Sequence, residues 1–125
     1  MARILVIDDS DDLRTIYQQM LSAAGYEVSV AAGGREGISH FRAQMPDLVI
    51  TDLFMPDLDG FQTITRLVEE FPAVKIIAMS GHDQASSMLQ IAQGFGARET
   101  LLKPFRVDKL LRTVEGVLKS RPSAG

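Results

Sequence analysis

Short apolar runs alternate with amphipathic helical segments five times along this chain, and no other feature restricts its fold as strongly. The apolar runs have the length and composition of β-strands and cover residues 4–7, 27–31, 48–51, 74–79 and 99–102. Elsewhere apolar residues recur at intervals of three and four, as on one buried helical face, over residues 13–24, 38–41, 61–71, 85–92 and 107–118. Consecutive strand–helix units predict a parallel sheet with helices on both faces.

The predicted strands differ in how many of their faces are apolar. Residues 4–7, 48–51 and 74–79 are almost continuously apolar, which is typical of strands buried on both faces. Residues 27–31 alternate between polar and apolar side chains, which indicates an edge strand. The order 2-1-3-4-5, common among doubly wound sheets, leaves strands 2 and 5 at the edges. We therefore predict a flavodoxin-like α/β fold: a doubly wound five-stranded parallel sheet with five helices.

Length and composition favour a single domain. The chain has 125 residues, of which 46% are hydrophobic, enough for one well-formed core. We expect residues 1–120 to form this domain and residues 121–125 to form a flexible C-terminal tail. No DNA-binding helix-turn-helix follows the fifth predicted helix, so we expect output through contact with another protein.

Charge and residue usage exclude several classes of function. The net charge is -3, which provides no basic surface for nucleic acid or for an anionic membrane. The absence of cysteine excludes disulfides, thiolate catalysis and cysteine-ligated zinc. The apolar run at residues 4–7 is too short for a signal peptide or a membrane helix. We therefore expect a soluble cytoplasmic protein without nucleic-acid or membrane partners.

Polar residues stand at the ends of four predicted strands. Asp8 and Asp9 end the first strand, Asp52 the third, Ser80 the fourth and Lys103 the fifth. Taken singly, each has an ordinary alternative: a helix cap, a turn residue or a solvated surface lysine. Because the carboxyl ends of parallel strands share one edge of the sheet, all five side chains are expected to converge there.

This convergence of charge predicts a metal-assisted phosphoryl site. Two carboxylates ~4 Å apart repel by roughly 4 kcal/mol at an effective dielectric constant near 20. Lys103 neutralises one charge, and a hard cation with oxygen ligands, best Mg²⁺, neutralises the rest. A cation and a lysine beside a carboxylate also favour phosphate binding and acyl-phosphate formation. Asp52 is the best candidate nucleophile because its predicted strand is central.

Four segments together resemble the signature segments of response-regulator receiver domains. They are residues 6–10, 52–60, 79–81 and 102–105, and the resemblance extends from about residue 3 to residue 119. It implies that Asp52 is the phosphoacceptor. It also implies that Mg²⁺ binds Asp9, Asp52 and the backbone carbonyl of Phe54, with Asp8 contributing through water.

The resemblance assigns further roles around the phosphoryl group. Ser80 would bind the group and report it, and Lys103 would form an ion pair with it. The bond between Lys103 and Pro104 would be cis, and Gly60 would permit the turn that opens the third helix. The implied function is a signalling switch of a two-component system or phosphorelay, a regulatory protein rather than an enzyme.

The same resemblance implies two kinds of partner. The phosphoryl donor would be a histidine kinase or a histidine phosphotransfer protein that docks on the first helix. The output target would contact the surface of the fourth helix, the fifth strand and the fifth helix. In the fourth helix the expected exposed residues are Ser86, Ser87, Gln90 and Ile91.

Three residues depart from the usual receiver pattern. Thr100 stands where many receivers carry an aromatic switch residue, although threonine also suits an edge strand. Phe54 is bulky where a polar residue is frequent and could hinder the water that hydrolyses the acyl phosphate. His82 could orient that water or be a plain loop residue. We hypothesise that Phe54 and His82 together set the lifetime of the phosphorylated state.

Two rival functions remain open at this point. An aspartate-nucleophile phosphohydrolase would share the Mg²⁺ and lysine, but its pattern carries a second Asp where this chain has Phe54. A flavodoxin-like cofactor binder would need a phosphate-binding loop of Gly, Ser or Thr after the first strand. Asp8 and Asp9 stand there instead and would repel a cofactor phosphate.

Overall fold

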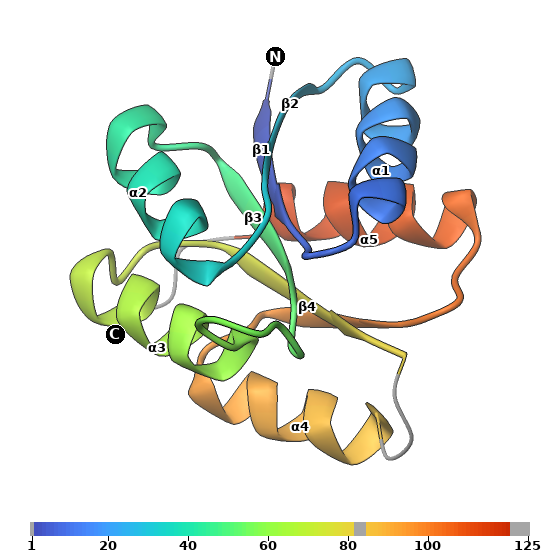
Figure 1. The fold of residues 1–125 in the computed structure, drawn as a ribbon. Helices are drawn as coiled ribbons and strands as arrows, with labels where there is room; N and C mark the ends of the chain where they lie inside the picture. Colours follow the sequence, from blue (N-terminus) through green and yellow to red (C-terminus); the bar gives the residue numbers. More distant parts are fainter. Residues whose placement is uncertain (1, 82–84, 121–125) are drawn as a thin grey trace.

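The structure, a computed structural model, describes residues 2–81 and 85–120. Strands and helices alternate throughout: β1 (Arg3–Ile7), α1 (Asp11–Ala23), β2 (Glu27–Ala31), α2 (Gly34–Gln44), β3 (Leu48–Asp52), α3 (Gly60–Glu70), β4 (Ile76–Ser80), α4 (Ala85–Phe95), β5 (Glu99–Leu102) and α5 (Val107–Lys119). The sheet is parallel with the order β2-β1-β3-β4-β5, so the predicted fold class is confirmed (Figure 1). Among the described helices none is long and apolar enough to cross a membrane.

The sheet separates two apolar cores. On one face α1 and α5 cover the sheet, and on the other α2, α3 and α4 cover it (Figure 1). Successive side chains of a strand point to opposite faces, so in β1 Ile4 and Val6 enter the first core while Leu5 and Ile7 enter the second. Strands β1, β3 and β4 are buried along nearly their whole length, as a strand covered on both faces must be.

Three boundaries of the predicted third and fourth strands are corrected. The fourth strand begins at Ile76 rather than at residue 74, because its pairing with β3 starts at Ile76 opposite Val49. The amide of Val74 instead donates to the carbonyl of Phe71 in the preceding turn. Asp52 and Ser80 are the last residues of β3 and β4 rather than the residues that follow them.

The predicted buried face of the first helix is only partly correct. Tyr17 and Leu21 are buried, but Ile16 is 42% exposed and Ala24 is exposed at the C-cap. The sheet covers a narrow strip of this helix, and Ile16 lies beside that strip. Gly25 follows the C-cap residue Ala24 with a φ of 96°, the left-handed conformation that glycine adopts readily at a helix end.

Local capping directs the chain around the carboxyl edge of the sheet. Ser10 caps α1 by accepting a hydrogen bond from the amide of Leu13, and Asp59 and Gln62 form a capping box at the start of α3. Position 60 requires glycine because a Cβ there would clash with the backbone of Asp52 and Leu53, and not because of an unusual φ angle. The predicted tail of residues 121–125 lies outside the described residues.

Candidate functional site

The structure brings the predicted polar residues together at the carboxyl edge of the sheet. Asp8 follows β1, Asp52 ends β3, Ser80 ends β4 and Lys103 follows β5. The strand register aligns these ends, since Asp52 pairs with Met79 and Ser80 with Leu102. The convergence that the sequence predicts from topology is therefore present in the fold.

Three carboxylates form a compact cluster at this edge. One oxygen each from Asp8, Asp9 and Asp52 lies within 4.8 Å of the others. Asp8 is 1% exposed and Asp52 is 6% exposed, whereas Asp9 faces solvent. Two nearly buried carboxylates and one accessible carboxylate form a ligand set of hard oxygens, which fits Mg²⁺ with water completing its shell.

Lys103 provides the positive charge within the cluster. Its Nζ lies 3.1 Å from Oδ2 of Asp8 and 3.6 Å from Oδ1 of Asp52. Burial by itself lowers the pKa of Lys103, but the charges of Asp52 and Asp8 outweigh it and hold the pKa above its ordinary value. Lys103 therefore remains an ammonium at neutral pH, able to neutralise a second anion.

Asp52 is the carboxyl group whose ionisation the fold opposes most clearly. Burial raises its pKa from 3.8 to about 6, against the opposing charge of Lys103, and the charges of Asp8 and Asp9 add to the rise. The amide of Leu53 donates to Oδ1 of Asp52 at 3.0 Å, which favours the ionised form in part. A bound cation would relieve the remaining cost.

Ser80 is completely buried, and its Oγ has no hydrogen-bond partner among the described residues. A buried hydroxyl without a partner costs about 1–3 kcal/mol, so such a group is suited to an oxygen-rich ligand. Ser80 does not line the hollow above the carboxylates, however. Its carbonyl accepts from the amide of Lys103 at 2.9 Å and so couples the ends of β4 and β5.

A hollow of about 570 Å³ opens above the carboxylates. It is lined by Asp8, Asp9, Ser10, Leu13, Asp52, Phe54, Met55, Pro56, Asp59 and Lys103. Phe54, one of these lining residues, is 36% exposed.

Sequence reasoning missed one supporting residue. Nη1 of Arg14 donates to the carbonyl of Asp8 at 2.8 Å and steadies the first carboxylate loop from inside α1. A lone arginine in the first turns of a helix has no sequence signature of its own, so only the fold reveals this contact.

The remaining predicted positions have different outcomes. The bond between Lys103 and Pro104 is cis, as predicted. Thr100 is half-buried in β5, paired with Ala78 of β4. His82 lies outside the described residues.

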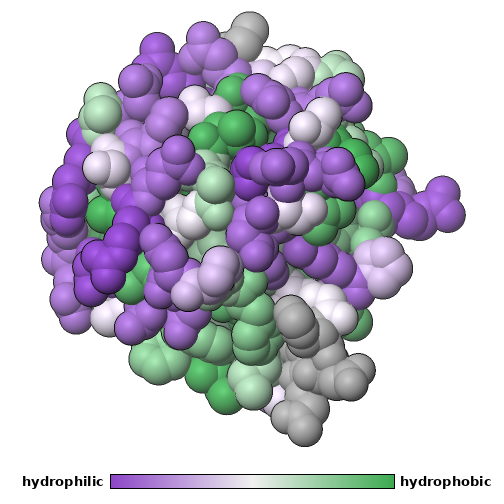
Figure 2. Space-filling model, viewed as in Figure 1, coloured by the Kyte–Doolittle hydropathy of each residue, from purple (hydrophilic) through white to green (hydrophobic). Residues whose placement is uncertain are grey.

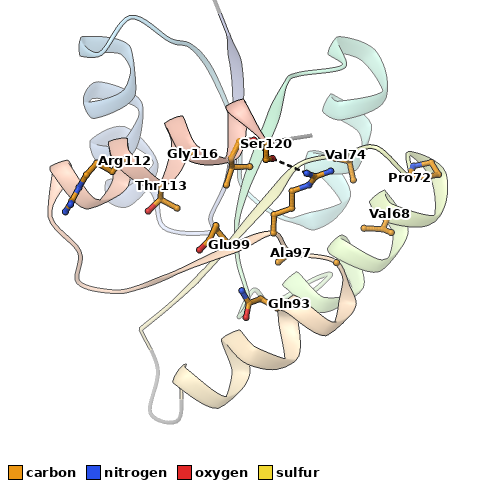
Figure 3. A pocket seen from close by; sticks show the side chains of 13 residues that line it. Val68, Pro72, Val74, Gln93, Ala97, Glu99, Arg112, Thr113, Gly116 and Ser120 are labelled. Carbon is orange, nitrogen blue, oxygen red and sulfur yellow. Dashed lines mark hydrogen bonds between the residues drawn. The ribbon is translucent and has the colours of Figure 1, made fainter. Parts of the chain in front are cut away.

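The amino edge of the sheet has a different character. A hollow of about 640 Å³ lies there between the ends of α4 and α5 (Figure 3). Arg98, Glu99 and Arg112 are among its lining residues, and Nη1 of Arg98 donates to Oγ of Ser120 at 3.1 Å. Within residues 2–81 and 85–120, the cluster of Asp8, Asp9 and Asp52 is the one group of three or more acidic or histidine side chains placed to hold a metal, and it lies at the opposite edge.

Apolar side chains also gather on the outer surface of α4. Figure 2 shows hydrophobic residues over the lower part of the view, where Figure 1 places α4. Ile91 is 48% exposed and Phe95 is 47% exposed on this helix, and Leu102 of the neighbouring β5 is exposed as well. Ser86, Ser87 and Gln90 are exposed beside them, as predicted.

Comparisons with known proteins agree with the geometry. A family model described as the response regulator receiver domain matches residues 4–115. The protein PilH of Pseudomonas aeruginosa is 36% identical over 120 residues, covering 94% of this chain and 98% of PilH. The chemotaxis protein CheY of Thermotoga maritima is 30% identical over 118 residues, covering 94% of this chain and 98% of that protein.

A solved structure is similar over the same extent. The response regulator protein TrrA of Thermotoga maritima, determined in complex with Mg(2+)-BeF, has a TM-score of 0.85 and 30% sequence identity, covering 94% of this chain and 99% of TrrA. The similarity thus includes every strand and helix that contributes to the carboxylate cluster.

Proposed function

This chain belongs to the response regulator receiver domain family, a regulatory module of two-component signalling, and we propose that it is a switch operated by phosphorylation of Asp52. One observation carries this proposal. Asp52 is nearly buried at the end of a central strand, with two further carboxylates within 4.8 Å and the ammonium of Lys103 at 3.6 Å.

Asp52 acts as the nucleophile in the proposed reaction. One of its carboxylate oxygens attacks the phosphorus of a phosphohistidine or a small acyl phosphate. The bond between phosphorus and the donor breaks, the electron pair leaves with the donor, and Asp52 becomes an acyl phosphate. The transfer needs no other covalent step, so the rest of the site contributes positioning and charge.

The neighbouring residues stabilise the added negative charge. Lys103 already lies between Asp8 and Asp52, and it pairs with a phosphoryl oxygen when the Asp52 carboxylate is esterified. Ser80 does not line the hollow before transfer; on phosphorylation its hydroxyl would turn toward the phosphoryl group and donate to a second oxygen, gaining the hydrogen bond that it lacks among the described residues. Mg²⁺, held by Asp9, Asp52 and the carbonyl of Phe54 with Asp8 through water, would supply positive charge against the phosphoryl oxygens.

The complex of the related TrrA with Mg(2+)-BeF supports a magnesium-dependent site in this chain. In this chain the cluster of Asp8, Asp9 and Asp52 supplies the oxygen ligands that a magnesium site requires, and the exposure of Asp9 provides a route for the cation.

Phe54 and His82 set the lifetime of the phosphorylated state in this proposal. Phe54 lines the hollow through which water would approach the phosphorus. Replacing both residues with alanine is expected to change the rate of dephosphorylation, measured as loss of the phosphorylated mass after removal of the donor. An unchanged rate in the double variant would show that neither residue controls hydrolysis.

The proposed donor is a histidine kinase or a histidine phosphotransfer protein docking on α1. Output passes through contact with another protein on the surface of α4, β5 and α5. Ile91 of α4 and Leu102 of β5 have exposed side chains that support this surface, since exposed apolar groups favour protein contact.

The direct test is the intact mass of the protein after incubation with acetyl phosphate. The wild type is expected to gain one phosphoryl group only when Mg²⁺ is present, and Asp52→Asn is expected to gain none. Asp57→Asn is the matched control, because Asp57 lies exposed in the same loop and does not line the hollow. An adduct that persists in Asp52→Asn would refute Asp52 as the acceptor.

A regulatory role also predicts the absence of catalytic turnover on small phosphate esters. Phe54 occupies the position where an aspartate-nucleophile phosphohydrolase would carry its acid. Steady release of p-nitrophenol from p-nitrophenyl phosphate, lost in Asp52→Asn, would instead establish a phosphohydrolase.

A further inference from the structure

Tyr17 is an aromatic residue in an otherwise aliphatic strip of α1. It is 6% exposed and packs in the core between α1, α5 and the sheet. Its ring stacks on Phe105, with the ring centroids 5.5 Å apart and an angle of 20° between the planes. A stacked pair of this kind is worth about 0.5–1.5 kcal/mol beyond burial, and it restricts the orientation of both rings.

Phe105 comes two residues after Lys103, so the stack fixes the segment that carries the ammonium. The amide of Lys103 donates to the carbonyl of Ser80 at 2.9 Å, and this anchors the start of the segment. The Tyr17 ring anchors its other end. Between the two anchors, the Nζ of Lys103 reaches Asp8.

Tyr17 also lies within electrostatic reach of the carboxylate cluster. Tyr17, Lys103 and Phe105 line one surface hollow of about 470 Å³. Burial raises the pKa of the Tyr17 hydroxyl, the charge of Lys103 opposes the rise, and the charges of Asp8 and Asp52 add to it. Tyr17 stacks on Phe105, and Lys103, two residues earlier, lies 3.6 Å from Asp52, so a movement of Lys103 on phosphorylation would reach Tyr17 through this segment.

The stacked pair of Tyr17 and Phe105 lies on the opposite face of the sheet from the side chain of Thr100. Leu101 points into the core beneath α1 and α5, so Thr100, its neighbour in β5, points to the opposite face. An aromatic switch at residue 100 would report toward α4, whereas Tyr17 and Phe105 lie on the face of α1 and α5.

We infer that Tyr17 is a positioning residue for phosphoryl transfer: by stacking on Phe105 it holds Lys103 in line with Asp52, and it responds when Asp52 is phosphorylated. The inference rests on the proposed phosphorylation of Asp52. It differs from a purely structural role because the ring orientation at residue 17, and not merely apolar volume, governs the rate of transfer.

The first experiment measures the initial rate of phosphorylation by acetyl phosphate with Mg²⁺. Tyr17→Leu removes the stack and is expected to slow the reaction at least about tenfold, since misplacing a reacting group by ~1 Å can cost about 100-fold. Tyr17→Phe keeps the stacked ring and is expected to restore a rate near that of the wild type.

Leu21→Val is the control for general destabilisation. Leu21 lies one turn further along α1, fully buried in the same core. Its variant is expected to lower the unfolding temperature without slowing phosphorylation. If Tyr17→Leu reacts as fast as the wild type, or if Leu21→Val is slowed equally at equal stability, Tyr17 is only a core residue.

The second experiment uses the chain's own fluorescence, because it contains two tyrosines and no tryptophan. In a Tyr26→Phe background, beryllofluoride with Mg²⁺ is expected to change the tyrosine emission, which then comes from Tyr17 alone. An emission from Tyr17 that beryllofluoride leaves unchanged would contradict the coupling between Asp52 and Tyr17.

The two proposals fail in different ways. A wild-type protein that gains no phosphoryl group overturns the proposed function and this inference with it. A wild type that is phosphorylated, together with a Tyr17→Leu variant phosphorylated at the same rate, overturns the inference alone.

Discussion

The two edges of one sheet have opposite chemical characters. At the carboxyl edge, Asp8, Asp52 and Ser80 are buried, and Lys103 lies between the first two. At the amino edge, the ion pair between Arg42 and Glu70 is exposed to solvent. Both edges are built from the same five strands, so the difference arises in the last residues of the strands and in the segments that follow them.

The difference shows which polar residues cost stability and which do not. An exposed ion pair keeps most of its hydration and contributes little. A buried carboxylate gives up hydration that a single lysine does not fully replace, and the raised pKa of Asp52 records that cost. Groups with strongly shifted pKa values cluster at functional sites, so this cost favours the carboxyl edge as the functional edge that we propose.

The largest expected effect comes from removing the charge of Asp52 in the absence of metal. The pKa of Asp52 lies at about 6 in the fold against an ordinary 3.8. Between these values the folded state binds more protons than the unfolded state, so stability falls as the pH rises and the full cost is present above pH 6. Two pKa units correspond to about 3 kcal/mol, so Asp52→Asn is expected to be more stable than the wild type by that amount at neutral pH.

Urea unfolding in EDTA, followed from acid to neutral pH, measures this effect. The advantage of Asp52→Asn over the wild type is expected to shrink as the pH falls toward 4, where the wild-type carboxyl is also protonated. Asp57→Asn, on the exposed part of the same loop, provides the baseline. An advantage independent of pH would mean that burial of the Asp52 charge is not its source.

Magnesium is expected to stabilise the carboxyl edge almost as much. A ligand at 100 times its dissociation constant stabilises the folded state by about 2.7 kcal/mol. The unfolding temperature of the wild type should therefore rise with Mg²⁺, whereas that of Asp9→Asn should rise little. Arg112→Gln, at the amino edge, should keep the full increase. An equal increase in Asp9→Asn would exclude Asp9 as a ligand.

Loss of the α3 cap should have a smaller effect. Asp59 accepts from the amide of Gln62 at 2.9 Å, and removing an N-cap of this kind costs about 1 kcal/mol. Asp59→Ala is expected to lower the urea midpoint accordingly and to remain able to accept a phosphoryl group. Asp59→Asn retains the capping oxygen and should restore the midpoint. Loss of phosphorylation in both variants would show that Asp59 belongs to the reactive site and is not only the cap of α3.

The smallest effect is expected at the amino edge. Arg42 and Glu70 form a two-point ion pair whose side chains are 55% and 40% exposed. Glu70→Gln is expected to leave both the urea midpoint and the phosphorylation rate unchanged, measured at low and at moderate salt. A clear loss of stability would show that the two edges differ less than proposed here.

Much of the fold was predictable from local patterns. Continuous apolar runs marked the central strands because a strand covered by helices on both faces has no polar positions. Alternation in residues 27–31 marked the edge strand for the converse reason. The start of β4 was not predictable, since Val74 is as apolar as Ile76 and only pairing with β3 separates them.

The candidate site was also predictable from the sequence only in part. The placement of Asp8, Asp52, Ser80 and Lys103 followed from topology, because all parallel strands end at one edge. The burial of Ser80 away from the hollow, the contact of Arg14 with Asp8 and the stack of Tyr17 on Phe105 did not follow. Each depends on side-chain directions set by packing between segments far apart in the chain.

The sequence by itself determined the strand–helix alternation, the edge at which charge gathers and the chemistry available there. These features depend only on residue type and spacing, which are properties of the sequence itself. Only the tertiary structure decided how far the pKa of Asp52 rises, which two carboxylates Lys103 bridges and which ring holds Lys103 in place. Such quantities depend on distance and desolvation, and neither exists until the helices have closed over the sheet.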